Sequence, residues 1–155
     1  MTERLTLTDV TITDDVRGPP VIVGSGSLAM TRVALNGTAG VSWQTTVGTS
    51  TVDIDDCDFI DAQSSLNKSV ELNMGGLAVA ATITDSDFSK VGAPVLNGNG
   101  GCIGVQNSTG ELLVADTTFT GCATQGNGGA IWEQNAGKLS VTNSVFDGCD
   151  SGTQG

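Results

Sequence analysis

Aspartates are the residues of this chain best able to do chemistry, and they gather in two short segments of similar sequence. The six are Asp53, Asp55, Asp56, Asp58, Asp85 and Asp87. Glycoside hydrolysis uses two carboxylates that flank the scissile bond at a defined separation. A polysaccharide lyase would also need a cation or basic residue to stabilise negative charge, but no basic residues cluster with these acids and the chain has no histidine. We therefore expect a non-catalytic protein, with a carbohydrate-active enzyme that uses surface aspartates as the alternative.

Four of these aspartates also form a candidate calcium site. They are Asp56, Asp58, Asp85 and Asp87. Carboxylates stacked about 5 Å apart on neighbouring strands repel each other. A calcium ion, which takes six to eight oxygen ligands, would relieve that repulsion. The alternative is that Asp and Asn occupy these positions because they tolerate turn geometry, and Arg32, which aligns with Asp56, favours this alternative by supplying local charge pairing.

Two cysteines end matching segments and are candidates for a disulfide. Cys122 and Cys149 align, and the distance between stacked strands lies within the range that a disulfide accepts. The alternative is a pair of thiols filling a small inward pocket. We expect Cys57 to replace a small residue and Cys102 to belong to the core.

Three N-x-[ST] sequons are candidates for N-glycosylation. They begin at Asn36, Asn67 and Asn107. Asn107 falls in a variable loop, where a glycan would be tolerated.

The elements that must position these residues are copies of one segment. The clearest copies span 139–149 and 112–122, followed by 81–91, 52–62, 28–38 and 5–15. Apolar residues alternate within each copy, as in Leu112 and Val114, which predicts a strand with one buried face. Three Gly-Gly pairs, at 75–76, 100–101 and 128–129, are each expected to open a further short strand.

A single copy cannot bury its own apolar face, so the copies must stack on one another. Stacking predicts four inward columns of like residues: Leu5/Leu28/Val52/Ala81/Leu112/Leu139, Leu7/Met30/Ile54/Ile83/Val114/Val141, Ile12/Leu35/Phe59/Phe88/Phe119/Phe146 and Ala62/Val91/Cys122/Cys149. The other architecture considered, a β-sandwich of short strands, requires no such columns. The sequence therefore predicts an all-β fold, a right-handed parallel β-helix of about six coils in one domain over 1–155. The coils are expected near 5–15, 21–38, 41–62, 75–91, 100–122 and 128–149.

Composition narrows the classes of partner. The chain carries 17 acidic and 6 basic residues, for a net charge of −11. Nucleic acids and anionic membranes bind basic faces, so neither is expected as a partner. Apolar stretches are too short to span a membrane.

The paired motifs resemble a known repeat. Gly128-Gly129-Ala130-Ile131 followed by Ser144, Phe146 and Cys149 resembles the polymorphic outer membrane protein repeat of autotransporter passengers. The resemblance covers roughly residues 39–155, with Cys, Val or Ala where Asn is usual. It implies a surface-exposed β-helix used in adhesion or as a structural stalk, without catalytic residues.

We therefore expect an extracellular or cell-surface structural or adhesive module without a cofactor, with calcium as the alternative. No signal peptide is recognisable and the sequence stops in mid-repeat, which favours a segment of a longer secreted protein or export by another route. The expected partners are neighbouring coils of a parent chain, or other copies stacked end to end into a filament. Glycans or a host-cell surface are the expected adhesion targets.

Overall fold

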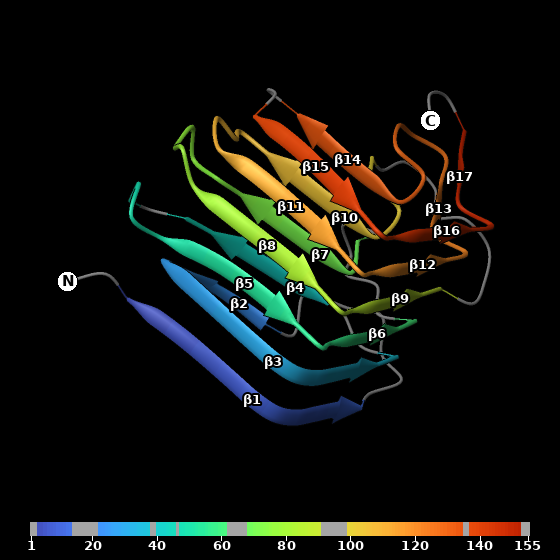
Figure 1. Cartoon of the computed structure of the whole chain (residues 1–155), viewed down its shortest axis with the longest axis horizontal. Coiled ribbons are helices and arrows are strands. Elements are labelled where there is room, and N and C mark those ends of the chain that lie inside the picture. Colours follow the sequence, from blue (N-terminus) through green and yellow to red (C-terminus); the bar gives the residue numbers. More distant parts are fainter. Residues whose placement is uncertain are drawn as a thin grey trace.

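The chain forms a parallel β-solenoid, shown by a computed structural model in Figure 1. The structure describes residues 3–13, 22–37, 40–45, 47–61, 68–90, 99–134 and 137–152. Within these ranges every regular element is a β-strand, and every strand pairs in parallel with its neighbours. The predicted all-β class and the stacking of coils are therefore confirmed.

The first sheet has ten strands and is folded along a bend. Strands that end at the bend are β5 (Thr51–Asp55), β8 (Ala80–Thr84), β11 (Glu111–Ala115) and β15 (Lys138–Thr142). Strands that follow it are β6 (Asp58–Ile60), β9 (Asp87–Ser89), β12 (Thr118–Thr120) and β16 (Val145–Asp147). β1 (Arg4–Thr13) and β3 (Ser27–Asn36) run through the bend without interruption.

The second sheet covers the open side of the first. Its five strands are β2 (Ile22–Ser25), β4 (Val41–Gln44), β7 (Val70–Asn73), β10 (Ile103–Gln106) and β14 (Ile131–Gln134). A short pair, β13 (Ala123–Thr124) and β17 (Asp150–Ser151), lies at one corner of the last coils. Within the described residues β1 has no counterpart in the second sheet, so the solenoid has fewer complete turns than the six coils predicted.

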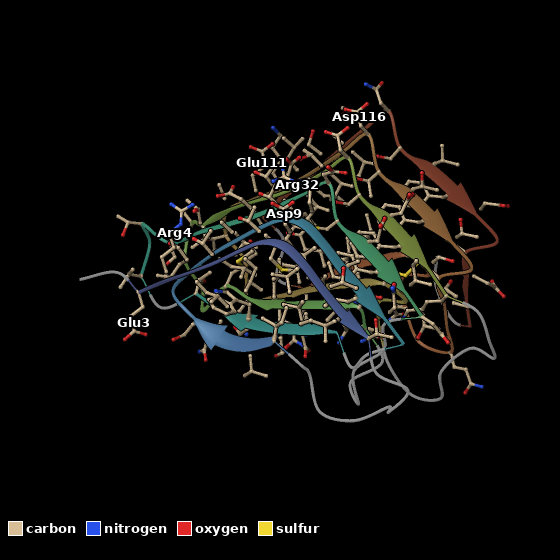
Figure 2. The ribbon with its side chains drawn as sticks, turned by 90° about the horizontal axis from the view of Figure 1, so that it is seen from below. Glu3, Arg4, Asp9, Arg32, Glu111 and Asp116 are labelled. Carbon is tan, nitrogen blue, oxygen red and sulfur yellow. A yellow bond between two sulfur atoms is a disulfide. The ribbon has the colours of Figure 1, made fainter. Side chains whose placement is uncertain are left out.

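The strand register confirms three predicted columns. Leu28 pairs with Leu5 on one side and Val52 on the other, and Met30 and Leu35 extend the next two columns in the same way. Side chains from the two sheets fill the space between them (Figure 2). The β-sandwich alternative is therefore wrong. In the fourth column Ala62 and Val91 lie outside the described residues.

The phenylalanines of the third column form a continuous stack. Ring centroids are 4.5 Å apart for Phe59 and Phe88, 5.1 Å for Phe88 and Phe119, and 4.8 Å for Phe119 and Phe146. The first three of these side chains are buried, whereas Phe146 on the last rung is 47% exposed. Each ring adds both buried apolar area and an aromatic contact to the interior.

One predicted boundary is wrong. Gly75 and Gly76 do not open a strand, because β7 precedes them. Both glycines have positive φ, 59° and 75°, and form a turn in which the Leu77 N–H donates to the Met74 carbonyl. The coil predicted at 75–91 therefore begins earlier, with β7. Gly100 and Gly128, by contrast, do precede strands, as predicted.

Candidate functional site

The aspartates of the bend form one column with an unusual backbone. Six residues there have φ between 48° and 55°: Asp9, Arg32, Asp56, Asp85, Asp116 and Asn143. The left-handed conformation is costly for most side chains, whereas Asp and Asn adopt it more readily than other non-glycine residues. The backbone alone therefore accounts for the recurrence of acidic residues at the bend. All six side chains are exposed.

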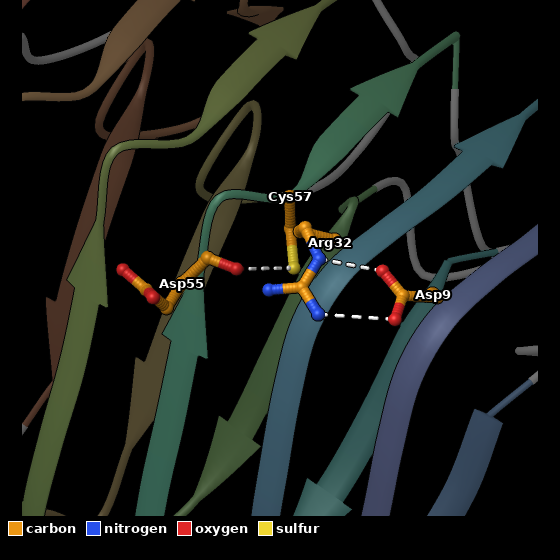
Figure 3. A network of polar contacts seen from close by, with 4 residues as sticks. All are labelled: Asp9, Arg32, Asp55 and Cys57. Atoms are coloured by element: carbon orange, nitrogen blue, oxygen red, sulfur yellow. Dashed lines mark hydrogen bonds and ion pairs between the residues drawn. The ribbon is translucent and has the colours of Figure 1, made fainter.

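The single cation in this column is paired. Arg32 donates from Nε to Asp9 Oδ1 at 2.5 Å and from Nη2 to Oδ2 at 3.0 Å (Figure 3). The hydrogen bond lowers the pKa of Asp9 and raises that of Arg32. Figure 2 shows both residues on the outside of the first sheet, where an ion pair contributes little to stability.

The four predicted calcium ligands lie on adjacent rungs. Asp58 and Asp87 are direct Cα partners on β6 and β9, and Asp56 and Asp85 are the bend residues just before these strands. Among the residues that the structure describes, no group of three or more His, Cys, Asp or Glu side chains lies close enough to hold a metal ion. A calcium site at these four residues stays a prediction.

Cys57 occupies a column of small polar residues, as predicted. Its thiol donates to the Asp55 carbonyl at 3.1 Å (Figure 3), and its N–H donates to Ser86 Oγ at 3.1 Å. Two rungs further on, the Thr117 N–H donates to Ser144 Oγ in the same way. Burial raises the pKa of the Cys57 thiol, so the side chain serves as a buried spacer at the bend.

The predicted Cys122–Cys149 disulfide is wrong, because Cys122 is bonded to Cys102. Their Cα atoms are 5.5 Å apart and both residues are fully buried. Cys102 precedes β10 and Cys122 follows β12 in the same coil. The bond therefore joins two positions of one coil instead of linking two successive rungs. Cys149 is a half-buried free thiol on the next rung, and burial raises its pKa.

The asparagines of two of the three sequons lie within the described residues. Asn107 is exposed, with φ of 53°, in the loop after β10, which fits a site that could accept a glycan. Asn36, at the end of β3, is half-buried, and its Oδ1 has no hydrogen-bond partner among the described residues. Asn67 lies outside the described residues.

A lysine crosses the outer face of the second sheet. Glu71, Gly104 and Trp132 occupy one outward column on successive rungs. Lys68 places its Nζ 3.2 Å from Glu71 Oε1 and 5.8 Å from the centroid of the Trp132 ring. A Cβ on Gly104 would overlap the Lys68 stem, so the missing side chain there leaves the space in which the lysine lies.

Beside this column the second sheet carries a ladder of side-chain amides. Gln44, Asn73, Gln106 and Gln134 are Cα partners on successive rungs. Three of them line a groove of about 230 Å³ together with Val23, Gly24, Ser42, Trp43 and Glu71. Sequence reasoning missed this groove, although the signal is present: each of these strands ends in Gln or Asn.

The last coil leaves its interior open. Leu139 and Val141 belong to inward columns but are 44% and 39% exposed. With Phe146, Ile131 and Cys149 they line a depression of about 430 Å³. At the opposite end Leu5, Leu7, Val10 and Ile12 are only partly buried.

Comparison of the chain with protein-family models, curated proteins and solved structures found no match. Within the described residues there is no helix with the length and apolar character needed to cross a membrane. The parallel pairing of strands in stacked coils defines the class as a parallel β-solenoid.

Proposed function

We propose that this chain is a non-catalytic β-solenoid module with a structural and adhesive role, located outside the cell or on the cell surface. The observation that carries the non-catalytic assignment is the bend column, whose positive φ values account for Asp56 and Asp85, two of the six candidate carboxylates, without a catalytic role. The stacked core supplies rigidity, and the outer faces supply surface for contact. The resemblance of the Gly-Gly and Phe-x-x-Cys elements to the polymorphic outer membrane protein repeat supports the same role.

The disulfide supports an extracellular setting. Bonds between cysteines persist in oxidising compartments and are rare in reducing ones. Cys102 and Cys122 are both completely buried, and the bond joins the two ends of one coil. A scaffold that functions outside the cell gains stability from such a bond.

The exposed ends suggest what the module stacks against. Leu139 and Phe146 on the last rung are separated by the same interval as Leu5 and Ile12 on the first, so a second copy in register would continue both apolar columns. The same register places Arg4 of that copy over Lys138, a repulsion between exposed like charges that salt would screen. We propose that the ends contact neighbouring coils, either of a longer chain or of other copies.

Surface labelling tests the location. Antibodies against the chain are expected to bind intact cells of the source organism as strongly as permeabilised ones. Binding only after permeabilisation would contradict the extracellular assignment.

Incubation with a panel of acidic and neutral polysaccharides tests the non-catalytic assignment. No new reducing ends or unsaturated products are expected. Product formation that is lost in Asp55→Asn or Asp58→Asn would instead establish the carbohydrate-active alternative.

A further inference from the structure

We infer that the groove on the outer face of the second sheet binds a neutral saccharide, at the level of a single sugar ring. The groove spans β2, β4, β7 and β10 and has a volume of about 230 Å³. Sites for drug-sized ligands usually measure about 300–1,000 Å³. The size therefore fits a small ligand, or one unit of a longer chain lying across the rungs. The inference rests on the proposed adhesive function and names its ligand class.

The polar lining repeats along the solenoid axis. Gln44, Asn73 and Gln106 follow one another on consecutive rungs, which in a β-sheet are about 4.8 Å apart. Each amide offers two N–H donors and a carbonyl acceptor. A sugar chain presents hydroxyls, which both donate and accept, at a similar repeat. A ladder of amides is thus suited to successive hydroxyl groups.

Two of these amides are already held in place. Gln106 Nε2 donates to Glu71 Oε1 at 2.9 Å, while Asn73 Oδ1 accepts from the Gly75 N–H at 3.1 Å and from Asn107 Nδ2 at 3.3 Å. Side chains ordered before binding lose less conformational entropy when a ligand arrives. Gln44 is exposed at the margin of the groove and is the member best placed to reach a ligand from the side.

The charge of the lining selects against anionic sugars. Glu71 is a carboxylate, and the described residues that line the groove include no lysine or arginine. The nearest cation, Lys68, forms an ion pair with Glu71, and its Nζ lies 5.8 Å from the centroid of the Trp132 ring. Because Lys68 already pairs with Glu71, the described lining offers no unpaired cation to a uronic acid or a sulfated sugar, whereas its amides can hydrogen-bond hydroxyl groups. The ligand class is therefore uncharged and rich in hydroxyls.

Small side chains leave space for the sugar ring, and apolar atoms line that space. Ser42 leaves the outward column shallow beside Glu71, and Val23, which is 68% exposed, forms an apolar wall. Beneath Gly24 lies the ring of Trp43, which a Cβ on Gly24 would overlap. The Trp43 indole donates to the Gly26 carbonyl at 3.1 Å, which fixes the ring. Apolar surface with a few placed polar groups is the usual composition of a small-ligand site.

Titration of the purified chain with neutral hexoses and their oligomers tests the inference. The side-chain amide NMR signals of Gln44, Asn73 and Gln106 are expected to shift with a saturable dependence on sugar concentration. Gln44→Ala should weaken binding about tenfold, the loss expected for a direct hydrogen bond of about 1.4 kcal/mol. Ser42→Gln should also weaken binding, because the longer side chain fills the groove.

Gln134→Ala is the matched control. Gln134 belongs to the same ladder but does not line the groove, so this variant should bind as the unchanged chain does. Absence of saturable shifts with neutral sugars would overturn the inference, as would equal loss in Gln134→Ala and Gln44→Ala, or tighter binding of uronic acid oligomers. If no neutral sugar binds but surface labelling gives the expected result, only the proposed ligand is contradicted. Labelling confined to the cell interior would instead remove the proposed function.

Discussion

The rings of Phe59 and Phe88 lie one above the other, with centroids 4.5 Å apart and planes inclined by only 3°. These residues sit on strands β6 and β9, far apart in sequence, and are brought together by the stacking of coils. Because the Phe119 ring lies on the other side of Phe88, each middle ring of the stack contacts an aromatic face above and below. The stack is therefore the part of the interior most sensitive to truncation.

Replacing Phe88 with alanine should strongly destabilise the fold. Phe88 is 1% exposed and lies between two rings, so Phe88→Ala is expected to lower the free energy of unfolding by about 3–5 kcal/mol. Phe146→Ala, on the half-exposed last rung, is the control and should cost much less. Urea unfolding followed by circular dichroism measures both. Equal losses would show that the stack does not form the interior in solution.

The backbone geometry of the bend column predicts which residue types are tolerated at position 85. With φ of 48°, this position suits Gly or Asn, and a β-branched residue is strained there. Asp85→Val should be less stable than Asp85→Gly by about 1–2 kcal/mol, measured by urea unfolding. Since the side chain is exposed, burial cannot produce this difference. A valine variant as stable as the glycine variant would contradict the bend geometry.

The geometry of the bend column also leads to a prediction about calcium binding. If backbone geometry is what selects Asp56 and Asp85, adding millimolar calcium should leave the melting temperature unchanged. A rise in melting temperature that is abolished by Asp58→Asn with Asp87→Asn would establish the calcium site instead.

Lys90 should make stability depend on pH in the alkaline range. The residue is 7% exposed, its Nζ contacts the Gly101 carbonyl, and burial lowers its pKa to about 8. The ordinary value is 10.5, so between pH 8 and 10.5 the unfolded chain binds more protons than the folded chain. The free energy of unfolding should therefore rise with pH across that window, by a total on the order of 3 kcal/mol from this group.

Lys90→Met is the control for that rise. Cys57 and Cys149 have raised pKa values and act in the opposite direction, because their thiols ionise more readily in the unfolded chain. Both thiols are retained in Lys90→Met, so the difference between the two pH profiles isolates the lysine. Parallel profiles would show that Lys90 titrates normally.

Reduction should destabilise the chain through one particular bond. Loss of the Cys102–Cys122 disulfide is expected to lower the free energy of unfolding by about 2–4 kcal/mol, measured with and without reductant. Cys149→Ser should lose the same amount on reduction, since Cys149 is a free thiol. If Cys149→Ser no longer responded to reductant, a Cys122–Cys149 pairing would be present in solution.

The open last coil predicts concentration-dependent association. Leu139, Val141 and Phe146 expose inward columns there, so copies of the chain should associate at high concentration, and more strongly at high salt. Phe146→Asp should abolish association by placing a charge in the contact. Analytical ultracentrifugation measures both effects. If the chain stays strictly monomeric at high concentration, the apolar face of the last coil would contact only coils of a longer chain and not other copies.

The columns could be predicted because two local rules fix them. Alternation decides which residues of a strand face inward, and the constant interval between positions such as Leu112 and Phe119 fixes the register of both strand segments at once. The placement of Gly75 could not be predicted in the same way, because loops of different length separate the strands and the Gly-Gly pair is shared by two kinds of turn.

The cysteine pairing and the groove depend on distances that no repeat encodes. Alignment brings Cys122 next to Cys149, whereas the bond to Cys102 depends on where the two ends of one coil meet. Likewise, outward residues such as Gln44 were identifiable as exposed, but the groove beside them depends on which side chains of neighbouring rungs come together, such as Ser42 beside Glu71. Both the cysteine pairing and the groove therefore depend on how one coil is arranged in three dimensions, which the repeat in the sequence does not specify.

A solenoid has only nearest-neighbour contacts, so it unravels one coil at a time from its ends. Residues 102–122 contain β10, β11 and β12 and are closed into a covalent loop. A force applied to residues beyond Cys122 would release the final coil and then encounter a loop that cannot lengthen. The bond thus keeps residues 102–122 from being extended, whereas the residues on either side of this loop can still yield to tension.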